Sequence, residues 1–166
     1  KRFIADVRAD TIVLHHDLLK EWKEAGLHAV VVGFEDIQDP RIEGYNKKYK
    51  ARIIPRSIEL LHELNMLIVG DFIVPPDYTE DDFTELERFI AANGIQVPVL
   101  SVLTPIPGTP LYEVMKDRIV VHDLDYYTFT NAVVPTFLPE KVFYKTFSEL
   151  VKRLQGKTAK AKAKDE

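Results

Sequence analysis

The chain has 166 residues, of which 46% are hydrophobic, and its formal net charge is −4 with no cysteine. This size suits one domain with a substantial core, and the charge gives no reason to expect nucleic-acid binding. The lack of cysteine excludes disulfides, thiolate zinc sites and any cysteine-ligated iron–sulfur cluster held by these residues alone. Because there is no bilayer-length apolar stretch and no signal-peptide pattern, we expect a cytoplasmic protein without a membrane span.

Short apolar runs of strand length occur along the chain, and each is rich in Val, Ile or Phe. They cover residues 3–7, 28–34, 67–74 and 97–103. Apolar side chains at helical spacing lie between them. The first such pattern, Leu14 to Trp22, ends at Gly26, a typical helix C-cap. The second covers residues 54–64, with Pro55 in its first turn.

A third helical pattern begins after Thr79, and Asp82 three residues later resembles a capping box. It is stopped by Asn93 and Gly94. A last helix is predicted from Glu140 to about Arg153. Residues 155–166 are low in complexity and rich in lysine, so we expect them to form a disordered tail beyond a domain of residues 1–154.

The alternation of strands and helices predicts βαβ units with parallel strands. Two α/β architectures fit: an open doubly wound sheet, or a partial (β/α) TIM-like barrel of about four parallel strands with intervening helices and a C-terminal helix. Polar residues near the strand ends, among them Asp6, Arg8, Glu35 and Asp71, favour the barrel, because its mouth binds ligands. Ion pairs between strands are the alternative explanation.

The turn TPIPGTP, residues 104–110, follows the fourth strand. Its prolines stiffen the backbone, and Gly108 permits a sharp turn. Such a loop could hold backbone groups around a ligand, or its rigidity could serve stability alone.

The segment LTPIPGTPLYE, residues 103–113, resembles the sixth-strand segment of radical S-adenosylmethionine enzymes. Four further segments agree in order. FIADVRAD resembles the third strand, WKEAGLHAVVVGFED a helix with the fourth strand, YNKKYKARIIPRSIELLHELNM the connecting helix segment, and LIVGDFIVPPDYTEDDF the fifth strand. Within this superfamily, the chain is most similar to cobalamin-binding enzymes related to hopanoid methylases and to the anaerobic magnesium-protoporphyrin ester cyclase. The likeness extends to about Arg153.

The resemblance implies the C-terminal half of a radical barrel. The whole protein would be an iron–sulfur oxidoreductase or methyltransferase that cleaves S-adenosylmethionine to a 5′-deoxyadenosyl radical. Its cofactors would be S-adenosylmethionine and a [4Fe-4S] cluster, with cobalamin as a further candidate, and it would act on a small-molecule substrate. The Cys-x3-Cys-x2-Cys loop that binds the cluster is not present here. We therefore expect an inactive chain without bound cofactor, metal site or catalytic residue of its own.

The resemblance also implies which residues would contact the cofactor: Arg8, Glu35, Ile73, Thr104, Pro105 and Gly108. Arg8 would bind a carboxylate, unless it pairs with Asp6 or Asp10. Glu35 would accept a hydrogen bond from a ribose hydroxyl or the amine, unless it is only a solvated loop acid.

Ile73 would pack on adenine, but the surrounding residues depart from the family pattern. Tyr78 stands at the family's glutamate position, and a plain core isoleucine is the favoured interpretation. Thr104, Pro105 and Gly108 would line the adenine edge through backbone groups.

His15, His16 and Asp17 suggest a metal cluster, but neighbours on a helix point apart, so the first turn of a helix is favoured. The acidic residues 80–87 are interpreted as complementing a helix dipole. The aromatic segment 123–139 would close the barrel or meet substrate by resemblance, or cover the last helix.

The alternative to a radical-enzyme fragment is a non-catalytic small-molecule or protein-binding α/β module, whose strand order would not follow the sequence. A half-barrel lacks its N-terminal half as a partner and exposes strand edges. We therefore expect a homodimer that buries these edges.

Overall fold

The computed structural model describes residues 1–38, 41 and 52–162. Its centre is a sheet of the strands β1 (Phe3–Asp6), β2 (Leu27–Glu35), β3 (Leu67–Val74) and β4 (Val97–Val102). All neighbouring strands are parallel, and their order is β1-β2-β3-β4. A doubly wound sheet reverses its strand order at a switch point, whereas a barrel adds strands in sequence. The sequential order therefore confirms the partial barrel.

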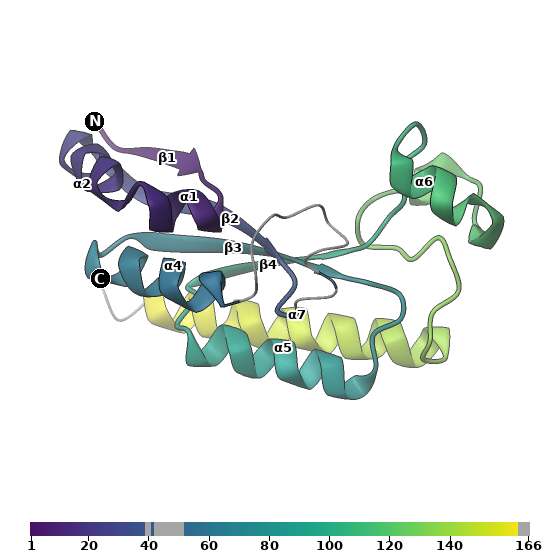
Figure 1. The fold of residues 1–166 in the computed structure, drawn as a ribbon. Helices are drawn as coiled ribbons and strands as arrows, with labels where there is room; N and C mark the ends of the chain where they lie inside the picture. Colours follow the sequence, from purple (N-terminus) through teal and green to yellow (C-terminus); the bar gives the residue numbers. More distant parts are fainter. Residues whose placement is uncertain (39–40, 42–51, 163–166) are drawn as a thin grey trace.

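Helices follow the strands and connect them. They are α1 (Ala9–Leu14), α2 (His16–Ala25), α4 (Ile53–Glu63), α5 (Glu80–Ala92), α6 (Pro110–Met115) and α7 (Glu140–Lys162), with short 3₁₀ turns η1 (Lys116–Arg118) and η2 (Leu124–Tyr126). Helices α4, α5 and α7 lie together on one side of the sheet, and α6 lies beyond the ends toward which the strand arrows point (Figure 1).

One face of the sheet carries the hydrophobic core. Side chains that alternate along the strands, such as Val32, Phe34, Phe72 and Val102, are fully buried in one cluster with side chains from the helices. The positions between them, such as Asp71 and Ile73, are less buried. The described part of the chain therefore forms a sheet with one covered face and one open face.

The predicted helix boundaries have clear local causes. Helix α2 ends at Gly26, whose φ of 114° is left-handed and would be strained for other residues. Helix α5 begins with the predicted capping box, in which the Thr79 side chain and the Asp82 side chain each bind the other residue's backbone N–H. Helix α7 is longer than predicted and includes residues 155–162 of the segment expected as a tail.

The first strand and the two helices after it expose apolar side chains. Ile4 is 56% exposed and Leu14 is 75% exposed; Phe3, Leu18 and Trp22 also rank among the exposed large hydrophobic residues. The predicted apolar spacing on α2 is therefore present, but only Leu19 of that helix is buried. In Figure 1 this region lies at the end of the sheet near the N-terminus.

No helix within the described ranges is both long and apolar enough to cross a membrane.

Candidate functional site

The carboxyl ends of the parallel strands meet at one edge of the sheet, which is where (β/α) barrels bind their ligands. On the open face, register places Asp6 beside Val31, Gly33 beside Asp71, and Ile73 beside Ser101. The chain then continues from β4 through Leu103, whose N–H donates to the carbonyl of Val74 over 2.9 Å. The segments that carry most of the candidate cofactor residues therefore end side by side.

Glu35 ends β2 in an unusual backbone conformation. Its φ is 66°, in the left-handed region that non-glycine residues rarely adopt. The pairing of β2 with β3 shifts register between Gly33 and Glu35, as in a β-bulge. Bulges redirect side chains at the mouths of barrels, and strained residues concentrate at functional sites. This geometry supports the selection of Glu35 as a site residue.

Acidic side chains gather on the open face. Burial raises the pKa of Asp71, and the negative charges of Asp6 and Glu35 raise it further. Asp6 and Glu35 are thus close enough for their negative charges to act on Asp71. A ligand with positive charge would relieve this repulsion.

Arg8 lines a cavity together with Asp6 of this acidic group, but it forms an ion pair with another acid. The first strand ends at Asp6, one residue before the predicted Val7. Arg8 is the N-cap residue of α1. Its guanidinium donates to both carboxylate oxygens of Asp10, over 3.0 and 2.8 Å. The side chain also lines a cavity of about 230 Å³ with residues of α2, including Trp22. The ion pair with Asp10 that the sequence offered as an alternative is therefore present.

The remaining candidates lie at the ends of β3 and β4. Ile73 is half-buried on the open face. Thr104 is buried, and its hydroxyl donates to the carbonyls of Val102 and Asn131 over 3.0 and 3.3 Å. Because this hydroxyl already donates to carbonyls of the chain, Thr104 would contact a ligand through its backbone groups.

The turn after β4 has a clear local role. Pro105 is buried, whereas Gly108 is exposed with a φ of 86°. Thr109 caps α6 by accepting the N–H of Tyr112, and Pro110 follows in the first turn. The stiff turn therefore starts a helix at the mouth of the partial barrel.

Sequence reasoning missed a buried acid next to Glu35. Asp36 is fully buried, and its carboxylate accepts the N–H groups of Ile37 and Gln38 over 2.6 and 3.0 Å. The Tyr78 hydroxyl donates to it over 3.4 Å, and Arg41 lies 3.7 Å away. Burial raises the pKa of Asp36, although the backbone donors and Arg41 oppose the rise. Tyr78, at the family's glutamate position, is the signal that could have indicated this network.

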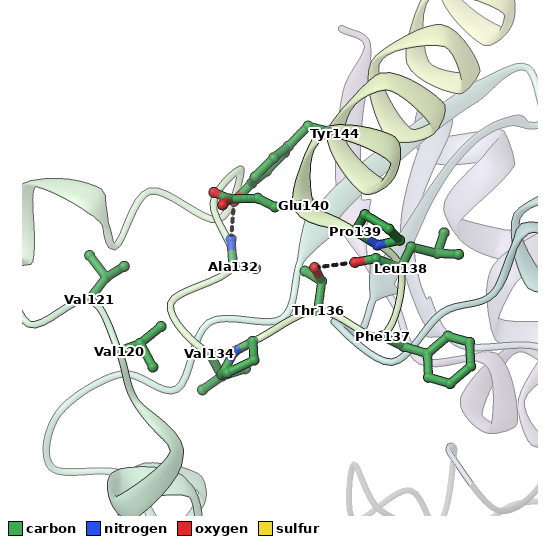
Figure 2. A pocket seen from close by; sticks show the side chains of 11 residues that line it. Val120, Val121, Ala132, Val134, Thr136, Phe137, Leu138, Pro139, Glu140 and Tyr144 are labelled. Carbon is green, nitrogen blue, oxygen red and sulfur yellow. Dashed lines mark hydrogen bonds between the residues drawn. The ribbon is translucent and has the colours of Figure 1, made fainter.

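The aromatic segment after η2 crosses the carboxyl ends of the last two strands. The carbonyl of Phe129 accepts the N–H of Val102 over 2.6 Å, and the N–H of Phe137 donates to Pro76 over 2.9 Å. Between the segment and α7 lies a cavity of about 530 Å³ with a mainly apolar lining. Figure 2 shows Glu140 and Tyr144 extending from α7 toward Ala132, whose N–H donates to the Tyr144 hydroxyl over 2.9 Å.

The histidine pair does not form a metal centre in the structure. His15 stands at the N-cap position of α2 without a side-chain cap hydrogen bond, and His16 is the first residue of the helix. Across the residues that the structure describes, no three His, Cys, Asp or Glu side chains lie close enough to hold a metal ion.

The chain is similar in sequence to known methylating enzymes. No family model matches the chain. In sequence it is 26% identical over 155 residues to the hopanoid C-3 methylase of Methylococcus capsulatus, covering 93% of this chain and 29% of the relative. It is 32% identical over 146 residues to the bacteriochlorophyllide d C-12(1)-methyltransferase of Chlorobaculum tepidum, covering 80% of this chain and 32% of the relative. The chain thus spans about a third of each relative's length.

Among solved structures, the radical S-adenosylmethionine methyltransferase TsrM from Kitasatospora setae, with cobalamin and a [4Fe-4S] cluster bound, aligns with a TM-score of 0.58. The alignment covers 82% of this chain and 28% of TsrM at 20% identity. The chain has the fold of part of a radical S-adenosylmethionine enzyme. The resemblance to this superfamily, and to its hopanoid methylase branch, is confirmed.

Proposed function

We propose that the chain is the C-terminal half of the barrel in a cobalamin-binding radical S-adenosylmethionine methyltransferase or oxidoreductase. The observation that carries the proposal is sequence similarity to two methylating enzymes over 93% and 80% of the chain. The sequential order of the parallel strands supports it as well. That order contradicts what the alternative, a non-catalytic binding module, predicted.

The open face suits one part of S-adenosylmethionine. This cofactor carries a positive sulfonium and a positive ammonium group, and Asp6, Glu35 and Asp71 place negative charge on the open face. In our proposal these carboxylates hold the positive groups, and Ile73 packs against the adenine. When bound and reduced, S-adenosylmethionine supplies radical chemistry; these residues orient it and exclude water.

The residues present do not suit the iron–sulfur cluster. Such clusters are bound mainly by cysteine thiolates, and the sequence contains none. The cluster and cobalamin are therefore assigned to the rest of the whole protein, and so is the substrate's reaction.

The N-terminal half of the barrel would pack against β1 and α2. These elements expose Ile4, Leu18 and Trp22, which a preceding strand and helix would cover. Similarity to only about a third of each relative's length agrees with a longer protein.

A titration of the isotope-labelled chain with S-adenosylmethionine, followed by NMR, tests the proposal. We expect a dissociation constant of about 1 mM, with amide shifts near Glu35, Asp71 and Ile73. Asp71→Asn should weaken binding about fivefold, because it removes charge beside the sulfonium and ammonium groups.

Two controls make this titration specific. Asp117→Asn, on η1, should leave the binding of S-adenosylmethionine unchanged. Neutral methylthioadenosine should bind equally to wild type and Asp71→Asn. Shifts confined to other regions, or equal binding of S-adenosylmethionine to both proteins, would contradict the assigned site.

A further inference from the structure

We propose that a second pocket, between α6 and the segments that follow β3 and β4, binds an apolar small molecule bearing a carboxylate, and that Arg118 binds this carboxylate. The pocket has a volume of about 270 Å³. Its lining comprises Arg41, Pro75, Pro76, Asp77, Leu103, Leu111, Met115, Arg118 and Val134.

The position of this pocket favours ligand binding. Pro75 directly follows β3, and Leu103 directly follows β4. Ligands of α/β proteins bind at the carboxyl ends of parallel strands. None of the candidate cofactor residues lines the pocket, so it is a second site. The inference does not rest on the proposed function.

The apolar wall of the pocket is already formed without a ligand. Met115 and Val134 are 9% and 2% exposed and belong to a small cluster with Ile119. The segment that carries Val134 is fixed on both sides: the N–H of Val120 donates to Val133, and that of Phe137 donates to Pro76, each over 2.9 Å. A preformed, mainly apolar pocket loses little entropy when it binds a ligand.

The two arginines that line the pocket differ in their interaction partners. Arg41 donates to Asp77 over 2.7 Å, lies 3.7 Å from Asp36 and covers the Tyr78 ring at 5.0 Å. Its charge is therefore compensated. Arg118 is exposed, and its guanidinium makes no hydrogen bond or ion pair with any residue in the described part of the chain.

The pocket therefore combines apolar walls with one guanidinium that is available to a ligand. A guanidinium binds a carboxylate through two parallel hydrogen bonds, and the apolar walls favour a hydrophobic body next to it. This combination selects an amphipathic carboxylate over a neutral apolar molecule.

The test uses 4-phenylbutyrate as the probe and 4-phenylbutan-1-ol as its neutral counterpart, in NMR titrations of the full chain. We expect 4-phenylbutyrate to shift the amides of Leu103, Leu111 and Met115. Arg118→Gln should weaken its binding about tenfold, since a hydrogen bond to a charged group is lost. Arg118→Lys should restore part of the affinity.

The matched control is Arg88→Gln, which changes an exposed arginine on α5, outside the pocket lining. It should leave the binding of 4-phenylbutyrate unchanged, and the alcohol should bind more weakly and equally to all variants. Shifts outside the pocket, equal binding of acid and alcohol, or full affinity in Arg118→Gln would overturn the inference. No S-adenosylmethionine is present, so failure here is separate from failure of the proposed function.

Discussion

Asp71 illustrates at the residue scale how a proposed ligand site can cost stability. Its pKa is raised above the ordinary value of 3.8, chiefly by burial and further by Asp6 and Glu35. The folded state therefore binds the proton more tightly than the unfolded state does. The stabilising contribution of protonated Asp71 is complete below pH 3.8 and is lost as the pH rises through the raised pKa.

Asp71→Asn should consequently make the chain more stable at neutral pH, by about 0.5 kcal/mol after allowance for solvent screening. Urea unfolding at acidic and neutral pH measures this, and the gain should vanish at acidic pH. Asp117→Asn serves as the control and should give no such pattern. A variant that is stabilised but binds S-adenosylmethionine more weakly would show the exchange of stability for function that binding sites commonly make. Equal stability of the wild type and Asp71→Asn at neutral pH would refute the prediction.

Single residues also mark where sequence reasoning ends. The sequence placed Glu35 among the polar residues near the strand ends, but it contained no sign of the left-handed φ at Glu35. Similarly, the buried Asp36 accepts a hydrogen bond from Tyr78, a residue 42 positions away in sequence. Such features arise from tertiary contacts, which local patterns do not encode.

At the element scale, two glycine substitutions test whether the turn before α6 requires a left-handed backbone. A Cβ added at Gly108 or at Gly156 would meet no atom within 4 Å, so neither substitution creates a clash. Gly108→Ala should destabilise the chain by about 1 kcal/mol, because its φ of 86° is unfavourable for alanine. Gly156→Ala, within helix α7, should stabilise by up to about 1 kcal/mol through helix propensity.

Urea unfolding of both variants measures the difference. If Gly108→Ala were as stable as the wild type, the left-handed turn would not be required. Gly108→Ala should also bind 4-phenylbutyrate more weakly than the wild type, because this turn starts the helix that carries Leu111 and Met115.

Elements with strong periodicity were predicted closely. The third strand was predicted at residues 67–74 and is observed as Leu67–Val74, because a buried apolar run leaves few alternatives. Helix α1 was not predicted as a separate element, since its break from α2 is a local change of backbone at His15. Helix α7 extends past Gly156, although glycine usually weakens a helix.

At the scale of the whole molecule, the partial barrel has an edge that can pair with another chain. At the β4 edge, Pro98 lacks an N–H and Val102 already donates to Phe129. At the β1 edge, Phe3 and Ile4 are 40% and 56% exposed. We therefore expect the chain to form a homodimer through β1, with a two-fold axis that brings the exposed side chains of α2 into the interface.

Ile4→Lys should dissociate this dimer, because the two-fold axis would place two new charges in one apolar interface. Light scattering after size-exclusion chromatography, over a range of protein concentrations, measures the effect. The wild type should approach twice the monomer mass as concentration rises, whereas Ile4→Lys should stay at the monomer mass. Val114→Lys, at a position on α6 that is 81% exposed, should dimerise like the wild type. A wild-type chain that remains monomeric at high concentration would show that an exposed β1 edge alone does not drive association.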